Sequence, residues 1–223
     1  MEKHKHLIIT LDGPAGAGKS TVAQGLAKRL GVSYLDTGAM YRALTLKALR
    51  LKINLEDEEA LSTLVQKTVI DFKEMPNGVL HVTLDGEDVG EAIRSSEVTN
   101  NTFYTAKAGK VREIMVNWQR AIGQHHSIVT DGRDQGTVVF PKANYKFYID
   151  ADFEERAQRR LKELKAAGKV MTIEQLKKDM QERDQKDFTR TVGPLKKAED
   201  AITIDSTGLG VEQTVDKIMK YIK

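Results

Sequence analysis

The sequence contains no cysteine, which excludes disulfide bonds, thiolate metal sites and cysteine nucleophiles together. It also has no apolar run near the ~18 residues that a membrane-spanning helix requires. The polar segment 1–6 leads directly into Leu7, without the apolar stretch of a signal peptide. An excess of one charge is missing too, because 35 Lys+Arg against 32 Asp+Glu give a net charge of only +3. We therefore expect a cytoplasmic monomer that binds neither membrane nor nucleic acid.

The 223 residues are 40% hydrophobic, enough for one packed core with a smaller lobe. Short β-type runs alternate with segments whose apolar residues recur at helical spacing, as at Val22, Leu26 and Leu30. This alternation predicts an α/β fold whose central parallel sheet is flanked by helices. The five predicted strands are Leu7–Leu11, Ser33–Leu35, Ser127–Val129, Tyr145–Ile149 and Ala201–Ile204.

One stretch interrupts the alternation. The turn formers Pro76-Asn77-Gly78 and Asp85-Gly86 separate three β-type runs there. This pattern predicts a small antiparallel sheet inserted at about 62–102. Its expected strands are Val69–Lys73, Val79–Leu84 and Asp88–Ile93.

The charged segment Lys162–Lys178 has Gly168 near its middle. It is typical of an exposed, mobile helical hairpin, although a solvated helix face would have the same composition.

A phosphate-binding loop follows the first predicted strand. Gly13-Pro14-Ala15-Gly16-Ala17-Gly18-Lys19-Ser20 fits the pattern G-x-x-x-x-G-K-[ST], and a helical pattern begins at Thr21. Glycines let backbone N–H groups turn toward phosphate oxygens, and the helix N-terminus adds positive potential. Lys19 is suited to bridge the β- and γ-phosphates, and the Ser20 hydroxyl to reach Mg²⁺. The loop predicts binding of ATP or another nucleoside triphosphate, which switch GTPases, motor ATPases and small-molecule kinases share.

Three further clusters combine Arg with Asp. They are the segments 36–42, 131–137 and 182–190, two of which follow predicted strands, where open α/β sheets bind ligands. Any one Arg–Asp pair is usually a surface ion pair. Three clusters beside a phosphate-binding loop favour a second anionic substrate held by arginine.

The strings GPAGAGKST, YLDTGAMYR, DGRDQGTVVFP, ERDQKDFTR and DSTGLGVEQ make the sequence similar to bacterial cytidylate kinases. The resemblance runs from Leu7 to the last predicted helix and includes the inserted sheet. It implies a core over 1–37 and 103–223, a lid at about 152–170, and a nucleoside monophosphate (NMP) lobe over 38–102. It also implies transfer of the γ-phosphoryl group of ATP to CMP or dCMP, giving CDP or dCDP.

The resemblance assigns roles to single residues. Arg42, Arg133 and Arg190 would hold the α-phosphate of the acceptor, and Arg183 and Asp187 would contact its sugar. Lys19, Arg133, Arg190 and a lid arginine would neutralise the transferring group. The charged segment 154–160 supplies the lid candidates Arg156, Arg159 and Arg160, of which Arg160 is the expected catalytic residue. Solvation at the surface is the competing interpretation of these arginines.

Base recognition would use Arg112 and Asp134, whose carboxylate accepts from the exocyclic amine of cytosine and rejects uracil. Thr37 would add a hydroxyl contact. Where the family has a serine near the base, this sequence has Phe103. Thr102, Thr105 or stacking of the Phe103 ring are the alternatives to that serine.

Asp131 follows a predicted strand. A role in the magnesium water shell and a role in fixing a loop are both open for it.

Two other functions are compatible with the sequence. One is a phosphate-loop kinase for UMP or a non-nucleotide acceptor, and the other is an ATP-dependent interaction protein without catalysis.

Overall fold

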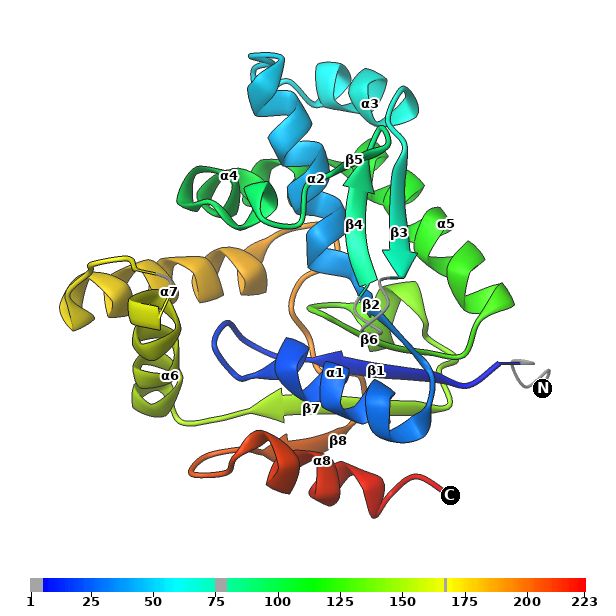
Figure 1. Ribbon diagram of the computed structural model, residues 1–223, viewed down its shortest axis with the longest axis vertical. Coiled ribbons are helices and arrows are strands. Elements are labelled where there is room, and N and C mark those ends of the chain that lie inside the picture. The colour runs from blue at the N-terminus through cyan, green and yellow to red at the C-terminus, as the bar shows by residue number, and fades with distance from the viewer. Residues whose placement is uncertain (1–5, 75–79, 167) are drawn as a thin grey trace. The chain divides into compact units, whose positions relative to one another are not determined.

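The computed structural model describes residues 6–74, 80–166 and 168–223. The chain divides into two compact units (Figure 1). The first contains the described residues up to Leu35 together with Gly123–Lys223, and the second contains Asp36–Ile122. Each unit has a hydrophobic core of its own.

The first unit is built on a five-stranded parallel sheet with the order β2-β6-β1-β7-β8. This confirms the predicted fold class and all five predicted strands, within one residue at each end except the last end of β6, which runs three residues further than predicted. In register, Asp12 of β1 lies beside Gly132 of β6, so the loops after these strands leave the sheet at the same edge. The strands are β1 (Ile8–Asp12), β2 (Ser33–Asp36), β6 (Ile128–Gly132), β7 (Tyr145–Asp150) and β8 (Ile202–Asp205).

Helices α1 (Lys19–Leu30) and α8 (Val211–Met219) pack against the sheet. Their apolar stripes, including Val22, Leu26 and Val215, form one buried cluster with Leu11 and Phe147 of the strands. Burial of such side chains contributes roughly 1.5–3 kcal/mol each. β1 is buried along its whole length, which fixes the start of the following loop.

Helices α6 (Phe153–Ala166) and α7 (Ile173–Thr189) form a hairpin (Figure 1). They pack through Ala157, Leu176 and Met180. The helical hairpin predicted around Lys162–Lys178 is therefore confirmed, and its mobility stays a prediction.

The second unit places helices around a small antiparallel sheet. Its elements are α2 (Thr37–Arg50), α3 (Glu58–Gln66), β3 (Ile70–Glu74), β4 (Leu80–Leu84), β5 (Glu87–Asp88), η1 (Ala92–Arg94), α4 (Ser96–Lys107) and α5 (Gly109–His125), whose last turn runs into the first unit. The sheet order β3-β4-β5 is that of the predicted insertion. Asp85 and Gly86 both adopt positive φ in the β4–β5 turn. The predicted turn at Pro76-Asn77-Gly78 lies outside the described residues.

The third inserted strand was predicted too long. Only Glu87–Asp88 pair with β4, and the remainder of Asp88–Ile93 turns into η1. The reason is that Val89 and Ile93 stand four residues apart and bury their side chains in the same core. The N–H of Ile93 donates to the carbonyl of Val89 at 3.0 Å, which closes a helical turn.

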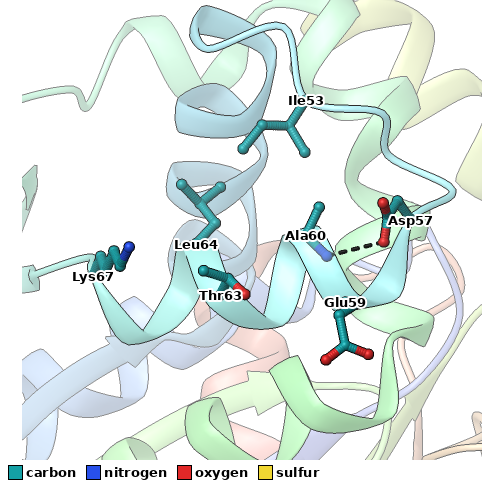
Figure 2. A pocket seen from close by; sticks show the side chains of 7 residues that line it. All are labelled: Ile53, Asp57, Glu59, Ala60, Thr63, Leu64 and Lys67. Carbon is teal, nitrogen blue, oxygen red and sulfur yellow. Dashed lines mark hydrogen bonds between the residues drawn. The ribbon is translucent and has the colours of Figure 1, made fainter.

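A hollow of about 450 Å³ lies beside α3 in the second unit. Ile53 and Leu64 line it together with Thr63 and Lys67, and Asp57 caps the helix by accepting from the N–H of Ala60 at 2.9 Å (Figure 2). Its lining includes none of the residues that the sequence predicts for a site. Within the described ranges, no helix is both long and apolar enough to cross a membrane.

Candidate active site

The loop between β1 and α1 has the backbone conformation that the phosphate-loop pattern requires. Gly13, Gly16 and Gly18 have φ values of 149°, 75° and 82°, which disfavour residues with a Cβ. At Gly13 a Cβ would lie 2.0 Å from the carbonyl oxygen of Ile149 in β7, so only glycine fits there. The loop ends at the N-terminus of α1, where free N–H groups and the helix dipole favour phosphate.

Lys19 opens α1 and is only 5% exposed. Its Nζ donates to the carbonyl of Pro14 at 2.7 Å, so the ammonium group reaches back across the loop. Burial and the positive charge of Arg133 lower the pKa of Lys19 to about 7, although Asp131 acts in the opposite direction. A polyanion bound here relieves this crowding of positive charge.

Ser20 is held by an acid at the end of β6. Its hydroxyl donates to Asp131 Oδ2 at 2.8 Å, and the Tyr34 hydroxyl donates to Asp131 Oδ1 at 2.6 Å. Asp131 therefore holds the side chains of Ser20 and Tyr34 in place, which corresponds to the second of its two predicted roles. The hydroxyl and carboxylate oxygens are hard donors of the kind that Mg²⁺ prefers, so the residues fit that ion. Among the residues that the structure describes, no group of three or more His, Asp or Glu side chains is placed to hold a metal.

Asp12, which the sequence analysis did not select, organises the loop after β6. Its two carboxylate oxygens accept from the N–H groups of Gln135 and Gly136 at 2.9 and 2.7 Å. These N–H groups begin η2, a π-helical turn over Gln135–Val139. Burial raises the pKa of Asp12 to about 6, even though both hydrogen bonds lower it. The available signal in the sequence was an acid directly after the predicted strand Leu7–Leu11.

Arg133 and Asp134 immediately precede η2 and pair with residues of the segment 182–190. Arg133 Nε lies 2.6 Å from Asp187 Oδ2, and Arg190 lies 3.7 Å from Asp134. Arg190 also donates to the carbonyl of Gly193.

Burial alone raises the pKa of Asp187, but Arg133 and Arg183 outweigh it, and the pKa lies below its usual value. The first unit thus brings together the predicted residues Lys19, Ser20, Arg133, Asp134, Arg183, Asp187 and Arg190.

The three lid arginines differ in their surroundings. Arg156 is 8% exposed and donates to Asp184 and to the carbonyl of Ala15, both at 2.7 Å. Arg159 donates to the carbonyls of Ser206 and Leu209 at 2.6 and 3.3 Å. Arg160 is more exposed and pairs with Glu163 at 2.7 Å.

The remaining predicted residues belong to the second unit. Asp36 caps α2 by accepting from the N–H of Ala39 at 2.8 Å, and it holds Arg42 at 3.0 Å. Thr37, the first residue of α2, is buried. Arg42 Nε is buried without a hydrogen-bond partner among the described residues.

Arg112 is 3% exposed, and its guanidinium lies 5.8 Å from the centre of the Tyr41 ring.

The alternatives for the missing serine are placed on α4. The Thr102 hydroxyl donates to the carbonyl of Val98 at 2.7 Å, and the Thr105 hydroxyl is buried at 2.9 Å from that of Thr45. Both hydroxyls therefore have partners within the unit. Phe103 is half-buried, and Lys107 Nζ lies 5.4 Å from its ring centre.

A phosphate loop between a buried central strand and a helix, with Arg133 after the neighbouring strand, is typical of P-loop proteins, among them the phosphotransferases. The family model for cytidylate kinase matches residues 9–223. Cytidylate kinases from Desulforamulus reducens and a Geobacillus species are 49% and 52% identical to this chain, over 98% and 96% of it and 98% and 95% of their own lengths. The chain belongs to the cytidylate kinase family.

A crystal structure of an uncharacterized protein from Eubacterium ventriosum has the same fold. Its TM-score is 0.55 at 15% identity, and the alignment covers 98% of each chain.

Proposed function

We propose that this protein transfers the γ-phosphoryl group of ATP to CMP or dCMP, producing ADP and CDP or dCDP, as a step of pyrimidine nucleotide metabolism. The proposal rests on membership of the cytidylate kinase family over nearly the whole chain. The observation that carries it is the cluster of Lys19, Arg133 and Arg190 beside the phosphate loop, with Asp134 and Asp187 among them. Such a cluster suits two phosphorylated substrates better than one.

On the donor side, the residues from Gly13 to Thr21 bind the phosphates of ATP. Loop N–H groups other than that of Ala15, which donates to Asp184, face the phosphate oxygens, and Lys19 neutralises the β- and γ-phosphates. Ser20 would hold the Mg²⁺ that accompanies ATP, and its hydroxyl is kept in place by Asp131. When bound, the ion neutralises charge that develops on the phosphate oxygens.

On the acceptor side, Arg42, Arg133 and Arg190 bind the α-phosphate. Arg183 and Asp187 contact the sugar, with the carboxylate accepting from a hydroxyl. The low pKa of Asp187 supports this role, because the group stays an acceptor at neutral pH.

The base is read by Arg112 and Asp134, and Thr37 adds a hydroxyl contact. A carboxylate accepts from the exocyclic amine of cytosine, whereas the carbonyl of uracil at the same place would meet it acceptor to acceptor. A polar group left unpaired in a buried site costs roughly 1–3 kcal/mol, enough to reject UMP.

Catalysis consists of positioning and charge neutralisation. The acceptor is already an anion at neutral pH, so the reaction requires no strong general base. Lys19, Arg133, Arg190 and Arg160 neutralise the transferring group. The segment at about 152–170 acts as the lid that excludes water, the segment 38–102 as the NMP lobe, and 1–37 with 103–223 as the core.

The test is ADP release measured in a coupled assay with CMP, dCMP, UMP and AMP as acceptors. We expect CMP and dCMP to stimulate ADP release and UMP and AMP to have little effect. Turnover of UMP equal to that of CMP would reject the substrate assignment. Absence of stimulation by every acceptor would reject the kinase activity itself.

We also propose that the protein works as a cytoplasmic monomer. Light scattering at micromolar concentration and fractionation of the source cells test the two parts separately. A mass twice that of the chain contradicts the first part, and recovery with the membrane fraction contradicts the second.

A further inference from the structure

A buried carboxylate joins the phosphate loop to both helices of the α6–α7 hairpin. Asp184 Oδ1 accepts from the N–H of Ala15 in the loop at 3.0 Å. Its Oδ2 accepts from Arg156 of α6 at 2.7 Å, and the same Arg156 nitrogen donates to the Ala15 carbonyl at 2.7 Å. Both peptide groups of Ala15 are therefore held by side chains of the hairpin. Asp184 and Arg156 are each 8% exposed.

The fit between loop and hairpin is steric as well as polar. A Cβ on Gly16 would lie 3.0 Å from the Arg156 carbonyl oxygen and 3.0 Å from Met180 Cε. Met180 in turn belongs to the apolar cluster between α6 and α7. The tip of the phosphate loop thus packs directly against both helices.

This arrangement poses an electrostatic problem for the binding of ATP. Asp184 places a negative charge within hydrogen-bond distance of a loop whose ligand is a polyanion, and in a buried site such a charge is poorly screened. Arg156 is the cation paired with that charge. Nε of Arg156 donates to the carbonyl of Ala151 at 3.2 Å, so the guanidinium is anchored from two sides.

We propose that Asp184 is a positioning residue that fixes the Ala15 peptide of the phosphate loop, and that Arg156 acts on ATP by neutralising Asp184 instead of contacting a phosphate. The inference deepens the proposed function and rests on it. It separates Arg156 from Arg160, which is the more exposed arginine one turn further along α6.

The test measures the Kd of a non-hydrolysable ATP analogue with Mg²⁺ by calorimetry, using the full chain. Arg156→Gln leaves the Asp184 carboxylate uncompensated, and we expect Kd to rise at least tenfold. Asp184→Asn added to Arg156→Gln removes that charge while its amide oxygen still accepts from Ala15. We expect this double variant to bind within about threefold of the wild type.

If Arg156 contacts a phosphate directly, the double variant stays at least tenfold weaker than the wild type, and the inference is overturned. Asp179→Asn provides the matched control, because Asp179 lies on the same helix and is exposed, accepting from Gln175. Combined with Arg156→Gln, it should restore no binding, and restoration would also overturn the inference.

Thermal unfolding of each variant separates loss of binding from loss of fold. Should Arg156→Gln alone fail to fold, the double variant compared directly with the wild type gives the same decision. The proposed function is tested by turnover of the wild type with CMP. If the wild type does not turn over CMP, the proposed function fails. If the double variant still binds the ATP analogue weakly, only the inference about Asp184 and Arg156 fails.

Discussion

The Tyr34 hydroxyl donates a hydrogen bond of 2.6 Å to Asp131, the same carboxylate that accepts from Ser20 at 2.8 Å. Tyr34 also packs its ring against the core of the first unit. A residue of β2 therefore sets the position of a phosphate-loop side chain through an acid of β6. The arrangement restricts the rotation of the Ser20 hydroxyl, which is proposed to hold Mg²⁺.

Tyr34→Phe keeps the ring and removes this hydrogen bond. A hydrogen bond to a charged group contributes roughly 1.5–3 kcal/mol, so we expect the Mg²⁺ concentration for half-maximal ADP release to rise at least fivefold. The measurement is a Mg²⁺ titration at saturating ATP and CMP. Tyr145→Phe is the control, because within the described ranges the Tyr145 hydroxyl bonds only the backbone of Lys223. An unchanged Mg²⁺ dependence in Tyr34→Phe contradicts the role of Asp131.

Arg133→Ala tests the acceptor side. Arginines that neutralise a transferring phosphoryl group supply roughly 10³–10⁵ in rate, so kcat/KM for CMP should fall at least a thousandfold. The Kd of ATP should change by less than about threefold. Steady-state kinetics and calorimetry give the two values. Arg29→Ala removes an exposed arginine paired with Asp216 and should leave both unchanged. Equal losses for CMP and ATP would contradict the assignment of Arg133 to the acceptor.

Asp12 makes stability depend on pH in an unusual direction. Its pKa is raised to about 6 in the folded chain, against about 3.9 when unfolded, so the folded state binds the proton more tightly. Its ionisation therefore costs stability above pH 6, and the cost disappears as the pH falls toward 4. Relative to Asp12→Asn, the wild type should gain about 2 kcal/mol between pH 7.5 and pH 4.5.

Urea unfolding of both proteins at the two pH values measures this gain. The pKa of Asp187 is lowered, so its protonation at low pH lowers the free energy of unfolding. This loss is the same in both proteins and cancels when they are compared. A difference between the two proteins that does not vary with pH would show that Asp12 keeps its ordinary pKa.

Lys19 should take up a proton when ATP binds. Its pKa of about 7 in the free protein leaves it mostly neutral at pH 8, and bound phosphates raise the pKa again. Calorimetry at pH 8 in buffers of different ionisation enthalpy should detect uptake approaching one proton per ATP. Lys19→Arg, which is charged throughout, is the control and should show no such uptake. Identical heats in all buffers for the wild type would contradict the lowered pKa.

Features that depend only on neighbouring residues could be predicted from local sequence patterns. The glycines and Lys19 of the phosphate loop, the five strands and the helical stripes all follow from local backbone preference and periodicity. The strand predicted to extend to Ile93 failed for the same reason, because helical spacing of Val89 and Ile93 had a stronger effect than the β-type composition.

Which charged groups pair with one another could not be predicted, because the partners lie far apart in the sequence. Asp184 reaches Ala15 across 169 residues of sequence, and Asp12 reaches Gln135 across 123. Composition likewise does not show that Arg156 is buried while Arg160 lies at the surface. Contacts of this kind depend on which strands are neighbours in the sheet and on how the helices pack. Both are determined by the free energy of the whole folded chain and not by any local segment. Local patterns thus set the elements of this molecule, whereas long-range packing set the pKa values and partners of its charged side chains.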